Sequence, residues 1–572
     1  MDATNGVCGS PPWLGKEQLN YLLSIAYAIH SFLQPCAQKA IVYPLTIFGK
    51  IASVRPIGTL VLRQFILPQR RFIVNQATAA FQKLIEAAQS SAMIRYEEAL
   101  RMYDNAIIAP PGGVLASQPL LEALAKHGRA SLLSPALNRA VYEAQRYASV
   151  MPQLQQEYIS SVKTTIDVMT AIPSAQFRRL KGASAKALAI RNHVERTGQT
   201  DLSELYRHVQ PVVDEVRAVA DALGTMWPNV EPYNRLMQLY GPGCSMADYQ
   251  KLSKPVLAFA RTLPLSDHQP TIPSIRVPEY EQLKMINSLT EVFGLNEQRG
   301  KIVIGSRGKC CRLGPNNIRP VIEIETENLS RALYVTLHEG VGHRFDYEQR
   351  PSFLMDGLIY EMLEEIRFME FWASIFSDYL PSSLEFWDNI CRVVVTPHTS
   401  ARVTPQNLWA ARNTVHLNPE WGYGGSLNTT LRMILLTELE HRLINNLLRV
   451  DQIEEWYEHR LQETFGQPCH DVRKHVLRMA MLYQGSFGNH ATYLPAECGA
   501  AAFGRRLPPE MVNQVAEWPR IGPYLQQQIG HGVLMDYSGL MNDTLGQPLT
   551  AEDWIKITKQ KITLSTMHIS NR

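Results

Sequence analysis

The sequence lacks the features that would place the protein in a specialised class. Its 572 residues carry 56 lysines and arginines against 53 aspartates and glutamates, a formal net charge of only +3. A dedicated nucleic-acid binder needs a basic excess or a basic stripe, so we expect no nucleic-acid partner. The 34 glycines and 35 prolines follow no collagen-like period, and a hydrophobic content of 45% excludes a chain that is disordered throughout.

Cysteine is scarce, and its spacing does not suit a structural role. None of the eight cysteines belongs to a CxxC pair, so the sequence has neither a disulfide framework nor zinc-ribbon spacing. The first residues also lack the charged, apolar and small-residue regions of a secretory signal. We therefore expect a reducing compartment and a cytoplasmic location.

Long uninterrupted apolar runs are missing from the N-terminal part of the chain. The two apolar stretches at 19–36 and 40–67 are broken by polar, charged or proline residues, and both fall short of the roughly 20 apolar residues of a membrane-spanning helix. We expect residues 1–70 to be an extension of a single large domain at 71–572. Docking of this extension to a membrane or a partner is the less favoured alternative.

The remainder of the chain has a mainly helical pattern. Helix-forming residues recur at three- and four-residue spacing, for example over 77–107 and 201–223. Two short runs with β-branched residues, at 301–305 and 320–326, interrupt this pattern. The sequence shows no repeat with a period of about 20–50 residues, so it does not indicate a solenoid. The sequence therefore predicts a mainly α fold with a small β-sheet.

Two histidines and a glutamate in one predicted helix form the most informative motif. The segment 329–349 contains His338, Glu339 and His343. Neutral imidazoles bind zinc, and a carboxylate beside the first histidine can act as the general base toward water. We therefore predict a Zn²⁺ site, or one for another divalent transition metal, with His338 and His343 as ligands and Glu339 as the base. Two unrelated histidines on a core helix are the alternative.

The spacing of this motif, HExxxH, is one residue longer than the usual HExxH. In a regular α-helix, at about 100° per residue, side chains five positions apart point about 140° away from each other. A one-turn π-bulge absorbs one residue and realigns them. Gly340 and Gly342 lie within the segment and supply the backbone freedom that a bulge needs. The spacing therefore predicts π-helical backbone between the histidines.

A third ligand is expected from the next predicted helix, at 358–372. This segment contains Glu361, Glu364, Glu365 and Glu370. Helical spacing places Glu365 on the apolar face and Glu364 on the polar face. A carboxylate on an apolar face has to be paired, bound to a metal or protonated. Glu365 is therefore the predicted ligand and Glu364 the reserve, whereas a buried Glu–Arg pair is the alternative.

These segments together resemble the carboxypeptidase Taq family of thermostable metallocarboxypeptidases. The similarity is carried by 315–351 and by further stretches in the same order along the chain, namely 232–252, 431–466, 484–504 and 540–557. The resemblance implies an almost all-helical body with a deep central cleft and a small β-sheet on the cleft wall. It also implies a zinc ion held by two histidines and a glutamate, a peptide or amide substrate, carboxypeptidase-like hydrolysis and a homodimer.

The resemblance assigns a role to one further residue, Tyr493, and draws attention to the nearby His490. Tyr493, in the sequence SFGNHATY, matches a cleft tyrosine of the family. Such a tyrosine can donate a hydrogen bond to the oxyanion that forms when water attacks the carbonyl. His490 lies close enough in sequence to share this catalytic role. A core tyrosine without a catalytic role is the alternative.

The chain departs from the family pattern in three places. The longer metal motif, together with the EEIR sequence that begins at Glu364, is similar to the dipeptidyl-peptidase III type of zinc enzyme. The family's His-Pro-Phe sequence is replaced by residues 307–309. Its arginine-and-acid motif, which helps to hold the substrate's C-terminal carboxylate, is replaced by residues 421–425.

Three cations are the candidate replacements for the missing carboxylate anchor, namely Arg307, Lys309 and Arg319. Two other functions stay open beside a carboxypeptidase. One is a specialised hydrolase of amides or small metabolites on the same fold. The other is a non-catalytic helical scaffold.

Overall fold

The computed structural model describes residues 67–263, 275–305, 308–314, 316–324, 328–349, 366–395, 403–415, 417–420, 425–529 and 536–570. The chain divides into two compact units, residues 1–76 and 77–572. The first unit is described only from Leu67, where helix α4 begins. The expected role of residues 1–70 therefore falls almost entirely outside the described residues. None of the described helices combines the length and the apolar composition that crossing a membrane requires.

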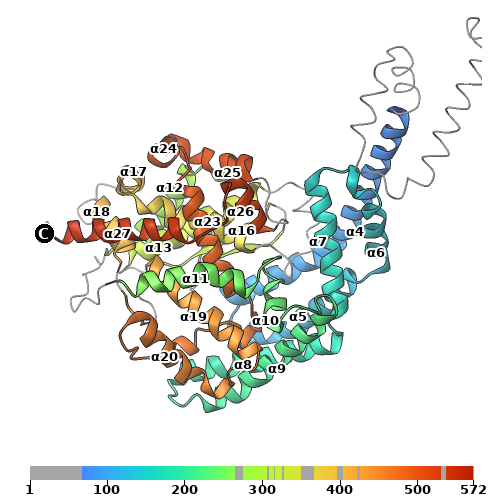
Figure 1. The fold of residues 1–572 in the computed structure, drawn as a ribbon, viewed down its shortest axis with the longest axis horizontal. Helices are drawn as coiled ribbons and strands as arrows, with labels where there is room; N and C mark the ends of the chain where they lie inside the picture. The colour runs from blue at the N-terminus through green and yellow to red at the C-terminus, as the bar shows by residue number, and fades with distance from the viewer. Residues whose placement is uncertain are drawn as a thin grey trace, which may run out of the picture. The chain divides into compact units, whose positions relative to one another are not determined.

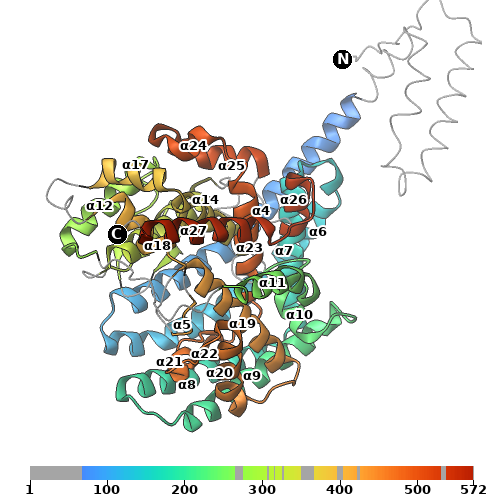
Figure 2. The ribbon, with the colours of Figure 1, turned by 60° about the vertical axis from the view of Figure 1, so that its left-hand side comes forward.

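Helices make up most of the described part of the second unit, which confirms the predicted fold class. The helices that precede the sheet are α4 (Leu67–Ile107), α5 (Pro111–Leu132), α6 (Pro135–Gln145), α7 (Gln153–Ala171), α8 (Ser174–Thr197), α9 (Ser203–Ala222), α10 (Pro232–Met237), α11 (Met246–Ala260) and α12 (Glu279–Val292). Helices α8 and α9 run side by side (Figure 1; Figure 2). Gly198 ends α8 in a left-handed conformation, with φ of 65°, which glycine adopts without steric cost.

A three-stranded sheet carries the helix with the metal motif. It consists of β1 (Val303–Ile304), β2 (Lys309–Arg312) and β3 (Ile318–Ile322). The order is β1-β3-β2, with β1 parallel and β2 antiparallel to β3. Two of these strands match the predicted β-like runs, whereas β2 was not predicted. Because side chains alternate along a strand, the sheet buries one face against α4 and the other against α12 and the motif helix.

The motif helix and its neighbours follow the sheet directly. These elements are α13 (Leu329–Val335), the π-helix η4 (Thr336–His343), α14 (Arg344–Gln349), α16 (Ile366–Ser374), the π-helix η5 (Ile375–Tyr379), α17 (Leu384–Val394) and α18 (Pro405–Asn413). Helix η4 packs against β3, α16 and η5. It thus lies between the sheet on one side and the α16–η5 helix on the other.

The C-terminal part of the chain supplies the remaining helices of the second unit. They are α19 (Ser426–Ile444), α20 (Ile453–Phe465), α21 (Val472–Val476), α22 (Met481–Gln484), the short 3-10 turn η8 (His490–Thr492), α23 (Tyr493–Gly504), α24 (Pro509–Asn513), α25 (Ile521–Ile529), α26 (Tyr537–Leu545) and α27 (Glu552–Ser570). Helix α23 packs against α16, η5 and α27, so the C-terminal helices contact the two elements against which the motif helix packs.

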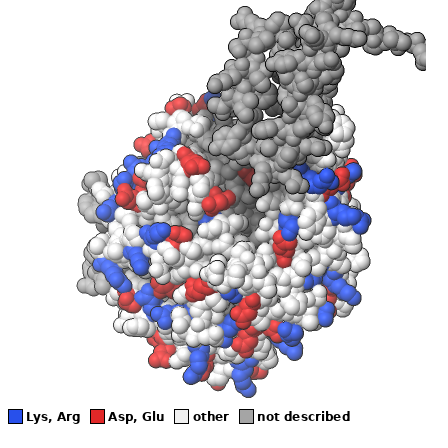
Figure 3. All heavy atoms as spheres, turned by 45° about the vertical axis from the view of Figure 1, so that its right-hand side comes forward, with Lys and Arg blue, Asp and Glu red and all other residues white. Residues whose placement is uncertain are grey.

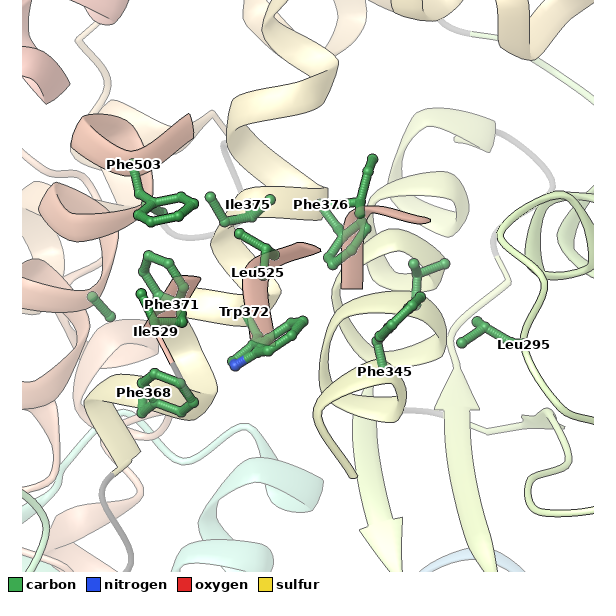
Figure 4. Close-up of a cluster of buried hydrophobic side chains, with 14 of the residues drawn as sticks. Leu295, Phe345, Phe368, Phe371, Trp372, Ile375, Phe376, Phe503, Leu525 and Ile529 are labelled. Atoms are coloured by element: carbon green, nitrogen blue, oxygen red, sulfur yellow. The ribbon is translucent and has the colours of Figure 1, made fainter. Parts of the chain in front are cut away.

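A stack of aromatic rings fixes the motif helix against its neighbour. Phe345 of α14 stacks on Trp372 of α16, with ring centroids 6.1 Å apart, and on Phe376 of η5, at 5.7 Å. Figure 4 shows these rings on facing helices within a larger buried apolar cluster. Each such pair adds about 0.5–1.5 kcal/mol beyond the area that it buries. The packing therefore holds the two helices in a fixed register beside the site.

The charged side chains in Figure 3 agree with the near-neutral composition. Lysine and arginine are interspersed with aspartate and glutamate over the face that is drawn, and neither sign forms a stripe there. The charged groups that affect the candidate site are instead buried ones.

Candidate metal centre

The predicted π-helical backbone between the two histidines is confirmed. Residues Thr336–His343 form the π-helix η4, in which a residue and the fifth one after it share a face. The rings of His338 and His343 lie 4.9 Å apart at 90° to each other. Donor atoms of His338, Glu339 and His343 lie within 4.8 Å of one another. The fold thus brings together the three residues that the motif singled out.

The two glycines of the motif differ in what they do. A Cβ atom at Gly342 would lie only 2.5 Å from the Cα atom of Ala373, where η4 crosses α16. A Cβ atom at Gly340 would meet nothing closer than 3.5 Å. Neither glycine has a left-handed conformation. Gly342 is therefore required for the close approach of two helices, a reason that differs from the backbone freedom expected from the sequence.

Among the residues that the structure describes, Glu370 of α16 brings a carboxylate from another helix to the two imidazoles. Its two oxygens lie 3.5 Å from Nε2 of His338 and 3.8 Å from Nε2 of His343. Zinc–ligand bonds of about 2.0–2.1 Å in a tetrahedral arrangement place neighbouring donor atoms about 3.3 Å apart. Oε2 of Glu370 is buried and has no hydrogen-bond partner among the described residues. This set of two imidazoles and one orphaned carboxylate oxygen fits a divalent metal.

Sequence reasoning named Glu370 as one of four glutamates but did not select it. The preferred Glu365 and the reserve Glu364 fall outside the described residues. A signal for Glu370 was nonetheless present in the sequence. It is a glutamate within the aromatic run 368–372, and a charge in such a run has to find a partner.

The electrostatics of the site favour a bound cation. Burial lowers the pKa of His338, but the neighbouring Glu370 and Glu339 carboxylates outweigh it and raise that pKa to about 9. Burial raises the pKa of Glu370, yet the two imidazoles hold it below its ordinary value. Without a metal, the carboxylates thus draw a proton onto His338. A divalent cation would satisfy the same negative charge.

Tyr493 starts α23 close to this cluster. The charge of Glu370, followed by burial and by the charge of Glu339, raises the pKa of the Tyr493 phenol well above its ordinary value. The phenol therefore stays protonated at neutral pH. A protonated phenol near the metal site can donate a hydrogen bond to an oxyanion.

His490 is held by a buried carboxylate that sequence reasoning missed. Nδ1 of His490 lies 2.6 Å from Oε1 of Glu440, which is fully buried on α19. The other oxygen of Glu440 accepts hydrogen bonds from the Tyr233 hydroxyl, at 2.8 Å, and from the Gly488 amide, at 2.9 Å. Glu440 thus fixes the imidazole of His490, whose ring centroid lies 6.4 Å from that of Tyr493.

Two of the candidate carboxylate anchors, Lys309 and Arg319, do not point toward this site. Arg307 falls outside the described residues. Val321, whose neighbour in the β-ladder is Lys309, packs toward α4. Strand alternation puts Lys309 and Arg319 on that same face. The side chain of Ile322 points the other way, toward Gly340 of η4. Lys309 and Arg319 therefore project from the face of the sheet opposite the metal motif.

Comparison with protein families decides the affiliation of the chain. The model of the family described as carboxypeptidase Taq (M32) metallopeptidase matches residues 83–562. The chain belongs to this family. The resemblance seen in the sequence is thereby confirmed, and this M32 protein is a metallopeptidase that uses a divalent metal.

Solved structures share the fold of this M32 metallopeptidase at low sequence identity. The Pyrococcus furiosus carboxypeptidase has a TM-score of 0.74 at 16% identity, with 84% of this chain and 99% of that chain covered. The M32 carboxypeptidase from Deinococcus radiodurans also has a TM-score of 0.74, at 19% identity, with 85% and 99% covered. Trypanosoma cruzi metallocarboxypeptidase 1 reaches 0.72 at 15% identity, with 85% and 99% covered. None of the curated proteins matches the chain in sequence.

Proposed function

We propose that the protein is a zinc-dependent, carboxypeptidase-like hydrolase with His338, His343 and Glu370 as metal ligands. The observation that carries the proposal is the approach of the Glu370 carboxylate to both Nε2 atoms, at 3.5 Å and 3.8 Å. Zinc suits two imidazoles and one carboxylate and leaves a fourth position for water or substrate. When bound, the ion would polarise the substrate carbonyl and lower the pKa of water.

The residues of this chain supply the proton transfers and the charge stabilisation. Glu339, next to the first histidine, takes the proton from the attacking water and passes it to the leaving amine. Tyr493 donates a hydrogen bond to the oxyanion of the tetrahedral intermediate. His490, held by Glu440, is the second candidate donor. The reaction is thus general-base hydrolysis of a peptide or amide bond.

Substitution of the general base tests the mechanism. The Glu339→Gln variant should keep one zinc per chain, because Glu339 is not a proposed ligand, and should lose hydrolysis by about 10²–10⁴-fold. Zinc content is measured by elemental analysis of the purified protein, and activity with a panel of peptides. Hydrolysis at the parent rate by this variant contradicts the assignment of Glu339.

A pair of substitutions decides between the two candidate third ligands. Glu370→Gln should weaken zinc binding strongly, whereas Glu365→Gln should leave it near the parent value. Competition with a chromophoric chelator measures both. The opposite result would assign the ligand to Glu365, as the sequence alone suggested, and leave Glu370 as a carboxylate outside the coordination sphere.

Substrate specificity separates the carboxypeptidase from its alternatives. The sequence-based candidates for the anchor of a substrate carboxylate are Arg307, Lys309 and Arg319, and of these Lys309 and Arg319 project from the sheet face opposite the metal motif. Peptides with free and with amidated C-termini distinguish the cases: a strict requirement for the free carboxylate supports a carboxypeptidase. Equal cleavage supports a specialised amide hydrolase. Stoichiometric zinc in the parent argues against a non-catalytic scaffold.

Two further expectations accompany this proposal. The family resemblance favours a homodimer, which light scattering of the purified protein tests. None of the described cysteines forms a disulfide, which favours a reducing, cytoplasmic compartment. Fractionation of cells that express a tagged full-length chain tests that location.

A further inference from the structure

A second π-helix lies directly behind the first metal ligand. Helix η5 (Ile375–Tyr379) packs against η4 and presents Ser377 and Asp378 to it. Oγ of Ser377 lies 3.2 Å from Nδ1 of His338 and donates a hydrogen bond to Oδ2 of Asp378, at 2.6 Å. Ser377 is fully buried. Short π-helical segments are rare and often occur at functional sites.

Counting the protons in this chain of contacts fixes the tautomer that the neutral imidazole of His338 adopts. A serine hydroxyl has one hydrogen, and an ionised carboxylate can only accept. Because Ser377 gives its hydrogen to Asp378, its oxygen accepts the Nδ1–H of His338. The lone pair of the neutral imidazole then resides on Nε2. That nitrogen faces Glu370 and is the atom that a metal requires.

Arg412 completes the arrangement from helix α18. Its guanidinium pairs with Oδ1 of Asp378, which leaves the other oxygen, Oδ2, to accept the hydrogen bond from Ser377. The same guanidinium lies 4.1 Å above the ring of Tyr334. The Tyr334 ring in turn lies 5.7 Å from that of His338. The contacts thus run from His338 to Ser377, Asp378 and Arg412 in turn. The Tyr334 ring then connects Arg412 back to His338.

The other histidine of the motif has no comparable support. Nδ1 of His343 is buried and has no hydrogen-bond partner in the part of the chain that the structure describes. Its position is set by the packing of η4 against α16, at Gly342. The two proposed ligands are therefore oriented by different means, and only His338 depends on a polar chain.

We propose that Ser377, Asp378 and Arg412 form a positioning relay that holds His338 in the tautomer whose Nε2 lone pair faces the metal, and so set the metal affinity. The inference rests on the proposed function, because it assumes that His338 is a ligand. The three residues touch neither metal nor substrate. They act through the imidazole, as outer-shell partners of metal-binding histidines do.

An isosteric substitution separates a relay from simple packing. In Asp378→Asn the amide oxygen is drawn to Arg412, so the amide NH₂ faces Ser377. The serine then accepts this hydrogen and turns its own hydrogen toward Nδ1 of His338, which favours the wrong tautomer. Packing is almost unchanged. Ser377→Ala removes the relay without imposing the wrong tautomer.

The measurement is the zinc dissociation constant, obtained by competition with a chromophoric chelator on the full-length protein. We expect it to rise about 10–100-fold in Ser377→Ala and at least as much in Asp378→Asn. Asp553→Asn is the matched control, because it breaks the ion pair between Asp553 of α27 and Arg505, an Asp–Arg pair outside the relay. Ser382→Ala is the matched control for Ser377→Ala. It also removes a serine hydroxyl, one that donates a hydrogen bond to the backbone carbonyl of Tyr379. Both controls should bind zinc as the parent does.

The possible outcomes distinguish the relay from the proposed function. A parent protein that binds no zinc, or a His338→Ala variant that binds it normally, overturns the metal site itself. A parent that binds zinc while a folded Asp378→Asn variant binds it equally well overturns the relay alone. Melting curves of the metal-free variants establish folding. If Asp378→Asn does not fold, Ser377→Ala decides: parent-like affinity refutes the relay, and weakened affinity supports it.

Discussion

Where η4 crosses α16, the backbone leaves no room for a side chain at Gly342 but does leave room for one at Gly340. At Gly342 an added Cβ would lie 2.5 Å from Cα of Ala373 and 3.1 Å from its backbone nitrogen. These are backbone atoms, so no rotamer change relieves the contact. At Gly340 the nearest atoms are side-chain methyl groups at 3.5 Å and beyond. We therefore predict that Gly342→Ala damages the site and that Gly340→Ala does not.

The size of the effect follows from the geometry. Carbon atoms pack at about 3.5–4.0 Å, so the two helices have to separate by about 1 Å to accept the new methyl group. Such overpacking costs about 1–3 kcal/mol of stability. The separation also moves His343, on η4, away from Glu370, on α16. Metal–ligand distances tolerate only about 0.2 Å, so we expect zinc affinity to fall by more than about 100-fold.

The assay compares three proteins under one set of conditions. Zinc affinity is measured by chelator competition, and the melting temperature of each metal-free form by circular dichroism. Gly340→Ala should keep the parent affinity and gain up to about 1 kcal/mol of stability, because alanine is the better helix former. Gly342→Ala should lose both affinity and stability.

Two results would refute this reasoning in different ways. Parent-like zinc binding by Gly342→Ala would mean that the close helix crossing does not hold the ligands together. Equal losses in both variants would mean that the π-helix itself needs glycine for backbone freedom, as the sequence alone suggested.

The remaining predictions concern the residues around the site. Glu440→Gln should lower kcat more than it raises KM, with zinc content unchanged, because it releases His490; unchanged kinetics would remove His490 from the mechanism. Removal of zinc with a chelator should lower the melting temperature, since a ligand that binds only the folded state stabilises it, and added zinc should restore it. Burial, followed by the charge of Asp378, raises the pKa of Glu497 to about 8. A folded-state pKa above the unfolded value means that stability is lost as pH rises from about 4.5 to 8, by up to about 1.4 kcal/mol per unit. Glu497→Gln, which can still accept from Thr430 and Trp554, should flatten the dependence of melting temperature on pH in this window, and a slope equal to the parent's would contradict the assignment.

The sequence by itself determined the features that depend on neighbours along the chain. Helical spacing predicted the fold class, because periodic burial is a local property of each segment. The pair His338 and His343, one residue too far apart for a regular helix, required the π-helix that η4 forms. Both follow from backbone geometry over fewer than about ten residues.

Only the tertiary structure decided which distant groups meet at the site. Helical spacing favoured Glu365 among four glutamates of one predicted helix, whereas the packing of η4 against α16 brings Glu370 to both imidazoles. The same crossing gives Gly342 its role, and the packing of η5 places Ser377 behind His338. These relations depend on the angle and distance between helices. The packing of side chains from the whole chain sets that angle and distance, and no single segment encodes them.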